Sequence, residues 1–131
     1  MSDVPVDWTE LREFRAVGLL DSFVLSWRLE ADLLQIDLDL LLLPEHALYE
    51  EPRPSESGCI RPAILEFPHC TLVSGDGVSD EALPMAVSGL SHGRITGLRL
   101  TADGQYELSG RFGVVKIHAE RPLLRIKRLA M

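Results

Sequence analysis

Asp37 and Asp39 are the two acidic side chains whose spacing in this sequence could support catalysis. Residues two apart on a strand point to the same face and lie about 7 Å from each other, which is compatible with a paired-carboxylate site. Solvent-facing acids on a half-exposed strand explain the same pattern, and the sequence ties no third polar group to them. We therefore expect no catalytic residues, and we place Asp37 and Asp39 among the candidate residues for binding a partner.

Four further side chains, His46, Cys59, His69 and Cys70, are of the types that bind zinc. Structural zinc sites usually place paired ligands about two to four residues apart, whereas adjacent His69 and Cys70 would point to opposite faces of a strand. We expect no metal ligands and no cofactor-binding residues. Both cysteines are expected to be buried free thiols, because a chain without an export signal stays in a reducing compartment.

The motifs of two common enzyme classes are missing from the sequence. Neither Gly75-Asp76-Gly77 nor Gly110-Arg111-Phe112-Gly113 has the spacing or the strand-to-helix setting of a phosphate-binding loop. The segment Val87-Ser88-Gly89-Leu90-Ser91 does not supply the nucleophile elbow of a serine hydrolase. We expect a protein that is not an enzyme.

The segment from His46 to Glu51 contains the other candidate residues for partner binding. It places Tyr49 beside Glu50 and Glu51 in a stretch that we expect to be exposed. An aromatic side chain next to acids is a combination found where proteins meet basic partners. A loop without a role would have the same composition, and that alternative stays open.

The formal net charge of −7 argues against binding to nucleic acid, which depends on a surplus of Lys and Arg. Acidic residues gather between Glu30 and Glu56, and basic residues between Arg111 and Arg128. This asymmetry indicates either a surface for a basic protein partner or neighbouring strands that neutralise each other.

A chain of 131 residues is long enough for one domain with one core, and its composition does not change along its length, so we expect a single domain over residues 1–131. The most apolar segment, Leu33 to Leu43, is far shorter than the ~20 residues that cross a bilayer. The acidic start does not resemble a signal peptide. We expect a cytoplasmic protein that does not bind membranes.

The first half of the chain predicts a short helix followed by a hairpin. Asp7 and Glu10 have the spacing of a capping box, and Gly18 is placed to end the helix that follows. From Asp21 the hydrophobic period is two, which predicts a strand with a buried face made of Phe23, Leu25, Trp27 and Leu29. After a turn at residues 30–33, a second strand is predicted to bury Leu34, Ile36, Leu38, Leu40 and Leu42.

The second half predicts an antiparallel meander. A loop over residues 44–58 precedes short strands at 60–65 and 71–73, with Pro62 confining the first of these to a sheet edge or a strand start. A turn at 74–77 and a helical turn at 80–83 come next. A strand at 94–101 and an Asp-Gly turn then lead to a long return strand at 106–119 with a bulge at Gly113, before a last strand at 124–127. We predict a mainly β fold: an antiparallel meander sheet, as a sandwich or partly open barrel, with one short N-terminal helix.

Leu41 and Leu43 share the outer face of the second strand with the two aspartates. Apolar side chains on that face indicate that the N-terminal helix or another subunit covers it. A homodimer is therefore one expected assembly.

Three short segments carry a family resemblance: Leu20-Asp21-Ser22 in the first strand, Leu65-Glu66-Phe67 in a middle strand, and Leu108-Ser109-Gly110-Arg111-Phe112-Gly113 leading into Ile117-His118-Ala119. Together they resemble the small bacterial all-β immunity proteins of polymorphic toxin systems and their uncharacterised relatives. That family usually has a His before the Asp of the first strand, where this chain has Leu20. The resemblance implies a non-enzymatic protein that neutralises a toxin by binding it.

We therefore expect a non-enzymatic binding protein with a basic protein partner, of which an immunity-type inhibitor is the narrower form. The alternatives are a small-molecule-binding or enzymatic β-domain and a structural homo-oligomer.

Overall fold

The computed structural model describes residues 6–52, 54–55, 58–74, 87 and 90–127. The turn predicted at 74–77, beyond Ser74, and the helical turn predicted at 80–83 lie outside these residues. The described strands are β1 (Val6–Asp7), β2 (Val17–Glu30), β3 (Leu33–Leu42), β4 (Cys59–Phe67), β5 (Leu72–Ser74), β6 (Gly93–Leu100), β7 (Tyr106–Gly110), β8 (Gly113–His118) and β9 (Leu123–Ile126).

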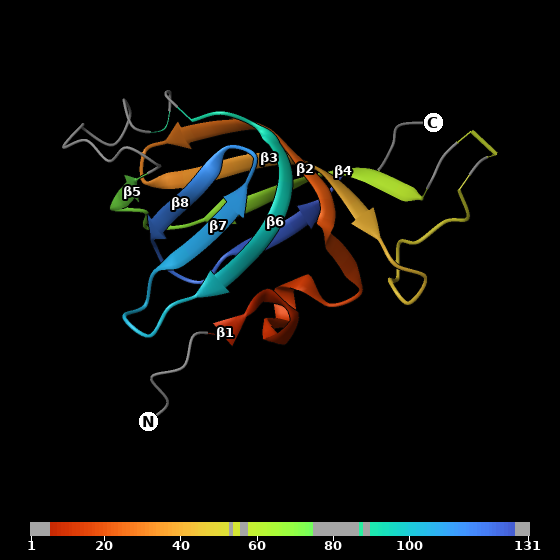
Figure 1. The fold of residues 1–131 in the computed structure, drawn as a ribbon, viewed down its shortest axis with the longest axis horizontal. Helices are drawn as coiled ribbons and strands as arrows, with labels where there is room; N and C mark the ends of the chain where they lie inside the picture. Colours follow the sequence, from red (N-terminus) through yellow and green to blue (C-terminus); the bar gives the residue numbers. More distant parts are fainter. Residues whose placement is uncertain (1–5, 53, 56–57, 75–86, 88–89, 128–131) are drawn as a thin grey trace.

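The strands form an open antiparallel sheet in the order β5-β8-β7-β6-β2-β3-β4-β9, with β1 paired to β6. The mainly β prediction is confirmed. In Figure 1 the β6–β7–β8 part lies in front of the β2–β3–β4 part, so the sheet folds back over itself. Two aromatic pairs join these layers, with ring centroids 5.2 Å apart for Phe67 and Tyr106 and 5.4 Å apart for Trp27 and Phe112.

Strand β3 follows its predicted pattern in full. Its inward side chains are almost completely buried between the two layers, and they are Leu34, Ile36, Leu38, Leu40 and Leu42. Strand β4 continues this face with Ala63, Leu65 and Phe67. A two-residue turn joins β2 to β3, with Ala31 in the left-handed region at φ 56°. The predicted hairpin is confirmed.

Strand β2 departs from its predicted buried face. It begins at Val17, before the predicted start, and its register against β3 shifts between Gly18 and Phe23 and again between Val24 and Ser26. As a result Phe23 and Leu25 are 46% and 47% exposed, whereas Val24 is buried. The prediction for Phe23 and Leu25 was wrong, because each extra residue in a strand reverses the face of the side chains that follow.

Ser22 holds the first irregularity of β2 together. Its side chain is fully buried, and its hydroxyl donates to the carbonyl oxygen of Gly18 at 2.9 Å. The Ser22 hydroxyl oxygen also accepts from the backbone N–H of Leu41 at 3.0 Å. Where β2 bends and the regular ladder is interrupted, the hydroxyl therefore supplies a hydrogen-bond partner to each of these two backbone groups.

The N-terminal helical segment is present as two successive 3-10 turns, η1 (Trp8–Glu10) and η2 (Arg12–Phe14). The Asp7 carboxylate caps η1 by accepting from the backbone N–H of Thr9 at 3.3 Å. An α-helix does not continue through Leu11, whose ψ of 123° is extended. The prediction that Gly18 ends the helix was wrong: Ala16 takes the left-handed φ of 60°, and Gly18 lies in β2.

The predicted long return strand is instead a second hairpin. Strands β7 and β8 pair with each other, and Gly110 and Gly113 face each other across a two-residue turn. A tight turn reverses the chain and a bulge does not, yet both shift the apolar parity in the same way. Gly113 has φ 94°, which explains why glycine stands there.

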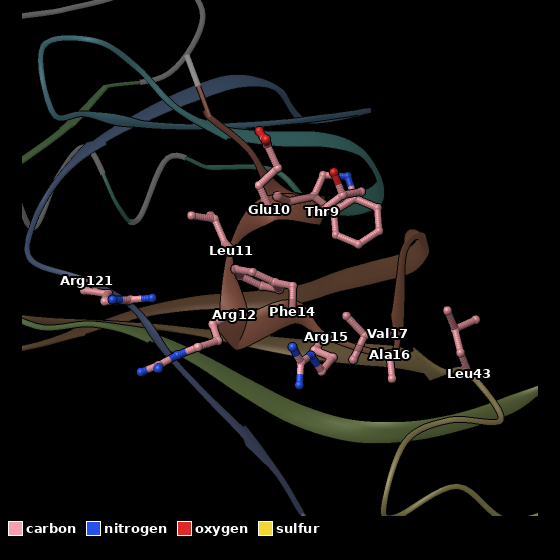
Figure 2. Close-up of a pocket in the computed structure, with 11 residues that line it drawn as sticks. Thr9, Glu10, Leu11, Arg12, Phe14, Arg15, Ala16, Val17, Leu43 and Arg121 are labelled. Carbon is pink, nitrogen blue, oxygen red and sulfur yellow. The ribbon is translucent and has the colours of Figure 1, made fainter. Parts of the chain in front are cut away.

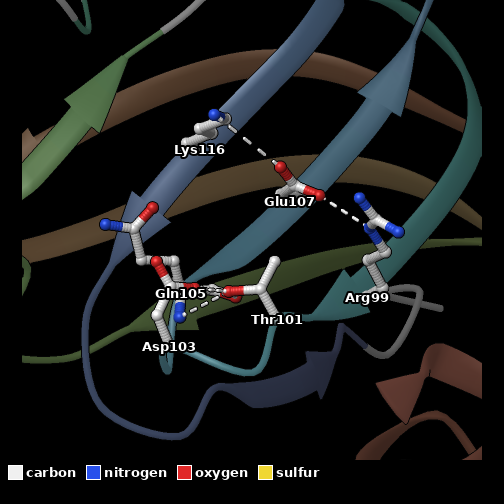
Figure 3. A network of polar contacts seen from close by, with 6 residues as sticks. All are labelled: Arg99, Thr101, Asp103, Gln105, Glu107 and Lys116. Atoms are coloured by element: carbon white, nitrogen blue, oxygen red, sulfur yellow. Dashed lines mark hydrogen bonds and ion pairs between the residues drawn. The ribbon is translucent and has the colours of Figure 1, made fainter. Parts of the chain in front are cut away.

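The predicted Asp-Gly turn between β6 and β7 is present (Figure 3). The Thr101 hydroxyl accepts from the Gln105 backbone N–H at 3.1 Å, and Gly104 takes φ 84°. Glu107 of β7 lies between Arg99 of β6 and Lys116 of β8, at 2.6 and 4.0 Å. These contacts are an example of charges that neutralise each other across neighbouring strands.

Pro62 does not lie in an edge strand, because β4 pairs with β3 on one side and with β9 on the other. The Pro62 carbonyl oxygen accepts from the Lys127 N–H, just beyond the last paired residue of β9. In an antiparallel sheet, the N and C=O of one residue are directed to the same neighbouring strand. The C=O of Pro62 is directed to the β9 side, so its nitrogen, which carries no hydrogen, is directed there too, where the β9 ladder ends. No hydrogen bond to β3 is lost.

Candidate binding surface

The outer face of the β2–β3–β4–β9 part of the sheet carries the predicted aspartates. The register places Asp37 between Ser26 and Ile64, and Asp39 between Phe23 and Pro62. We call this surface the outer face, and it consists of Phe23, Leu25, Ser26, Arg28, Gln35, Asp37, Asp39, Pro62, Ile64, Glu66, Leu123, Arg125 and Lys127.

Asp37 is the centre of a polar network on the outer face. Its carboxylate accepts from the Ser26 hydroxyl at 2.6 Å and from Arg28 at 3.1 Å, and Lys127 Nζ lies 3.8 Å away. Partial burial acts to raise the pKa of Asp37, but the Ser26 hydrogen bond and the Arg28 and Lys127 charges together hold it below its ordinary value. A carboxylate of this kind is a fixed anion and a poor proton donor, so it is unsuited to general acid catalysis.

A second polar network lies beside the first. Glu66 is buried, accepts from the Gln35 amide at 2.9 Å and pairs with Arg125 Nε at 2.6 Å. These contacts fix the side chains of β3, β4 and β9 relative to one another. The outer face is therefore a pre-ordered surface.

Asp39 has a different environment from Asp37. Its neighbours across the strands are the half-exposed Phe23 and the partly buried Pro62. Within the described residues, no hydrogen bond or ion pair joins the Asp39 side chain to another group. The structure thus brings the two aspartates to one face, as predicted, but ties only Asp37 into a network.

The exposed apolar residues Phe23 and Leu25 complete the outer face, and sequence reasoning missed them because it placed both in the core. Leu25 lines a shallow hollow together with Arg28, Asp37, Pro62 and Lys127. Ser22, which holds the bend of β2, stands at a polar position of the predicted alternation, so the pattern gave no signal of the bend.

The predicted loop residues lie apart from the aspartates. Tyr49 is partly buried against the core, whereas Glu50 and Glu51 are exposed. Glu50 pairs at 3.3 Å with Arg61, which stands opposite the inward-facing Leu40. The two groups of candidate residues therefore belong to opposite faces of β4 and do not form one site.

The four candidate zinc ligands are not brought together. Cys59 and Cys70 are buried free thiols, as predicted, and His46 Nδ1 accepts from the Leu48 N–H. His69 Nδ1 lies 3.2 Å from Asp32. Among the residues that the structure describes, no group of three or more His, Cys, Asp or Glu side chains has an arrangement that could hold a metal ion.

Comparison with known proteins returned no matching protein family, no matching curated protein and no matching solved structure. Within the described part of the chain, no helix has the length and apolar character needed to cross a membrane.

Proposed function

We propose that this chain is a non-enzymatic binding protein and that it engages a protein partner through the outer face. The observation that carries the proposal is the exposure of Phe23 and Leu25, 46% and 47%, on a strand within a hydrogen-bonded sheet. Large apolar side chains held on a rigid element are the usual anchors of protein interfaces.

The surroundings of these two side chains support the same proposal. Protein interfaces combine an apolar centre with a polar rim whose groups already have partners. Here the apolar centre is Phe23, Leu25 and Pro62, and the networks around Asp37 and Glu66 form the rim. A partner would cover ordered charges without having to reorganise them, which lowers the entropy cost of binding.

A basic protein fits this chain best as the partner. The outer face itself is close to charge balance, because Arg28, Arg125 and Lys127 lie beside its acids. The net charge of −7 therefore acts mainly over distance, by steering a basic partner toward the molecule, while the apolar centre determines how slowly the partner leaves. An immunity-type inhibitor of a basic toxin is the narrower form of this proposal.

The test compares three tagged proteins in affinity capture from their own cell lysate at low and high salt. They are the native chain, the Phe23→Ser/Leu25→Ser variant, and the control Leu72→Ser, which changes a residue that is 46% exposed on β5. One basic protein retained by the native chain and the control, and lost by the double variant, supports the proposal. Equal capture by all three removes the outer face from consideration.

The captured protein is then used to test whether this chain is an immunity-type inhibitor. A purified partner that is toxic when expressed alone, and harmless when expressed with the native chain but not with the double variant, would establish the immunity-type role. A partner without toxicity would reject that role and leave the binding function in place.

The apolar residues that suggested a structural homo-oligomer have contacts within the chain. The Leu41 side chain packs where a Cβ on Gly18 or Gly58 would be, and Leu43 lines a hollow beside the N-terminal turns. Both side chains are thus partly buried within one chain. Small-molecule binding is the second candidate function, and that same hollow favours it.

A further inference from the structure

An open hollow of about 580 Å³ lies between the N-terminal 3-10 turns and the sheet (Figure 2). This volume is within the range of pockets that hold small molecules. Three of its lining residues are arginines, Arg12, Arg15 and Arg121, in a chain whose net charge is −7. Such a concentration of positive charge needs an explanation.

Arg12 and Arg15 differ from the basic residues of the sheet, because no described residue gives them an acidic partner. Every Lys or Arg on a described strand lies in an ion pair with a carboxylate; these residues are Arg28, Arg61, Arg94, Arg99, Lys116 and Arg125. Neither Arg12 nor Arg15, both exposed, takes part in an ion pair with any described residue. No described carboxylate therefore neutralises their guanidinium groups.

The local fold places these three arginines around one hollow. Arg12 begins η2, and Arg15 follows its last residue, before Ala16 turns the chain with φ 60° into β2. Arg121 comes from the connection between β8 and β9, and η2 packs against β9. Two segments from opposite ends of the chain therefore bring guanidinium groups to the same hollow.

Apart from Thr9 and Glu10, the remaining lining is apolar. Trp8, Leu11 and Phe14 form a wall that is partly or fully buried. Glu10 also lines the hollow, but Figure 2 shows it at the other end from the three arginines, with its carboxylate directed away from them. The hollow thus combines three arginine side chains with an apolar wall.

We infer that this hollow binds a small organic phosphate. Guanidinium groups match phosphate oxygens with two parallel charge-assisted hydrogen bonds, and several around one group suit a dianion. The aromatic and aliphatic wall receives the organic part of the ligand. This inference is independent of the outer face, since it uses none of the same residues.

Isothermal titration calorimetry with phenyl phosphate tests the inference on the full chain. Phenol and inorganic phosphate are titrated separately, because they carry the two halves of the probe. The variant is Arg12→Gln/Arg15→Gln, and the matched control is Arg111→Gln, which changes an exposed arginine on the β7–β8 turn that likewise has no ion pair with a described residue. Thermal unfolding of each variant verifies that it is folded.

The expected result is one saturable site for phenyl phosphate, with affinity reduced about tenfold or more in the double variant by the loss of charge-assisted hydrogen bonds. Affinity is unchanged in the control. Inorganic phosphate is expected to bind more weakly than phenyl phosphate, and phenol not at all. Absence of binding at millimolar concentration, equal affinity in the folded double variant, or equal binding of phenol would overturn the inference. Equal affinity for inorganic phosphate and phenyl phosphate would reject the claim that the apolar wall binds the organic part of the ligand.

Discussion

Replacing Ser22 by alanine should remove a large share of the stability of this protein, although it deletes a single oxygen atom. The hydroxyl is fully buried, donates to the Gly18 carbonyl at 2.9 Å and accepts from the Leu41 N–H at 3.0 Å. Without it, two backbone groups at the bend of β2 lose their partner. Each unsatisfied buried polar group costs about 1–3 kcal/mol, so the expected loss for the two groups is about 2–6 kcal/mol. Domains of ordinary stability unfold with only about 5–15 kcal/mol.

Equilibrium unfolding in urea, followed by far-UV circular dichroism, measures this loss as a lower midpoint with an unchanged slope. Ser109→Ala is the matched control, because Ser109 is a half-buried strand residue with no side-chain hydrogen bond to any described residue. The control should change the free energy of unfolding by less than about 0.5 kcal/mol. If Ser22→Ala behaved like Ser109→Ala, the bend would not depend on the hydroxyl, and our explanation of the β2 register shift would be refuted.

Three further outcomes follow from other parts of the structure. Gly110→Ala should destabilise the protein by about 1–3 kcal/mol in urea unfolding, because its Cβ would overlap a backbone oxygen of β6 and an aromatic ring, whereas Gly97→Ala meets no atom within 4 Å and should be close to neutral. Asp37→Asn should lower the free energy of unfolding at pH 7, because folding holds the pKa of Asp37 below the ordinary 3.8. The stabilisation by the Asp37 carboxylate is therefore fully present above pH 3.8 and is lost as the pH falls through the lower pKa of the folded state. Unfolding of native chain and variant as a function of pH should therefore converge in acid, and a constant difference would contradict this. Burial raises the pKa of the Cys70 thiol, and Cys59 is also buried, so a thiol reagent at pH 8 should label neither in the folded protein and both in urea.

The sequence was sufficient to predict β3 but not β2. In β3 an apolar residue stands at every second position from Leu34 to Leu42 without interruption, so the period alone determines which side chains are buried. In β2 the apolar pattern is continuous through two register shifts, and Phe23 appears equivalent to the buried Val24. What distinguishes them is the pair of hydrogen bonds that Ser22 makes with Gly18 and with Leu41 of β3. The hydrophobic period does not predict such hydrogen bonds.

The same limit applies to the candidate sites. Asp37 and Asp39 were placed on one face because they belong to the regular strand. The exposed Phe23 was missed because it belongs to the irregular one. The arginine-lined hollow combines Arg12 with Arg121, whose proximity depends on how β9 returns to the N-terminal turns. Contacts between opposite ends of a chain leave no local pattern in the sequence.

The bent β2 strand also affects how the chain folds. It belongs to the local meander β2–β3–β4 and pairs with β6 at only two positions, Phe23 with Arg94 and Val24 with Gly93. Each meander can form its hairpins early, since they close short loops, whereas the β2–β6 and β4–β9 pairings join distant residues and close late. We therefore expect the pairing of distant strands, at the short β2–β6 junction among them, to limit the rate of folding.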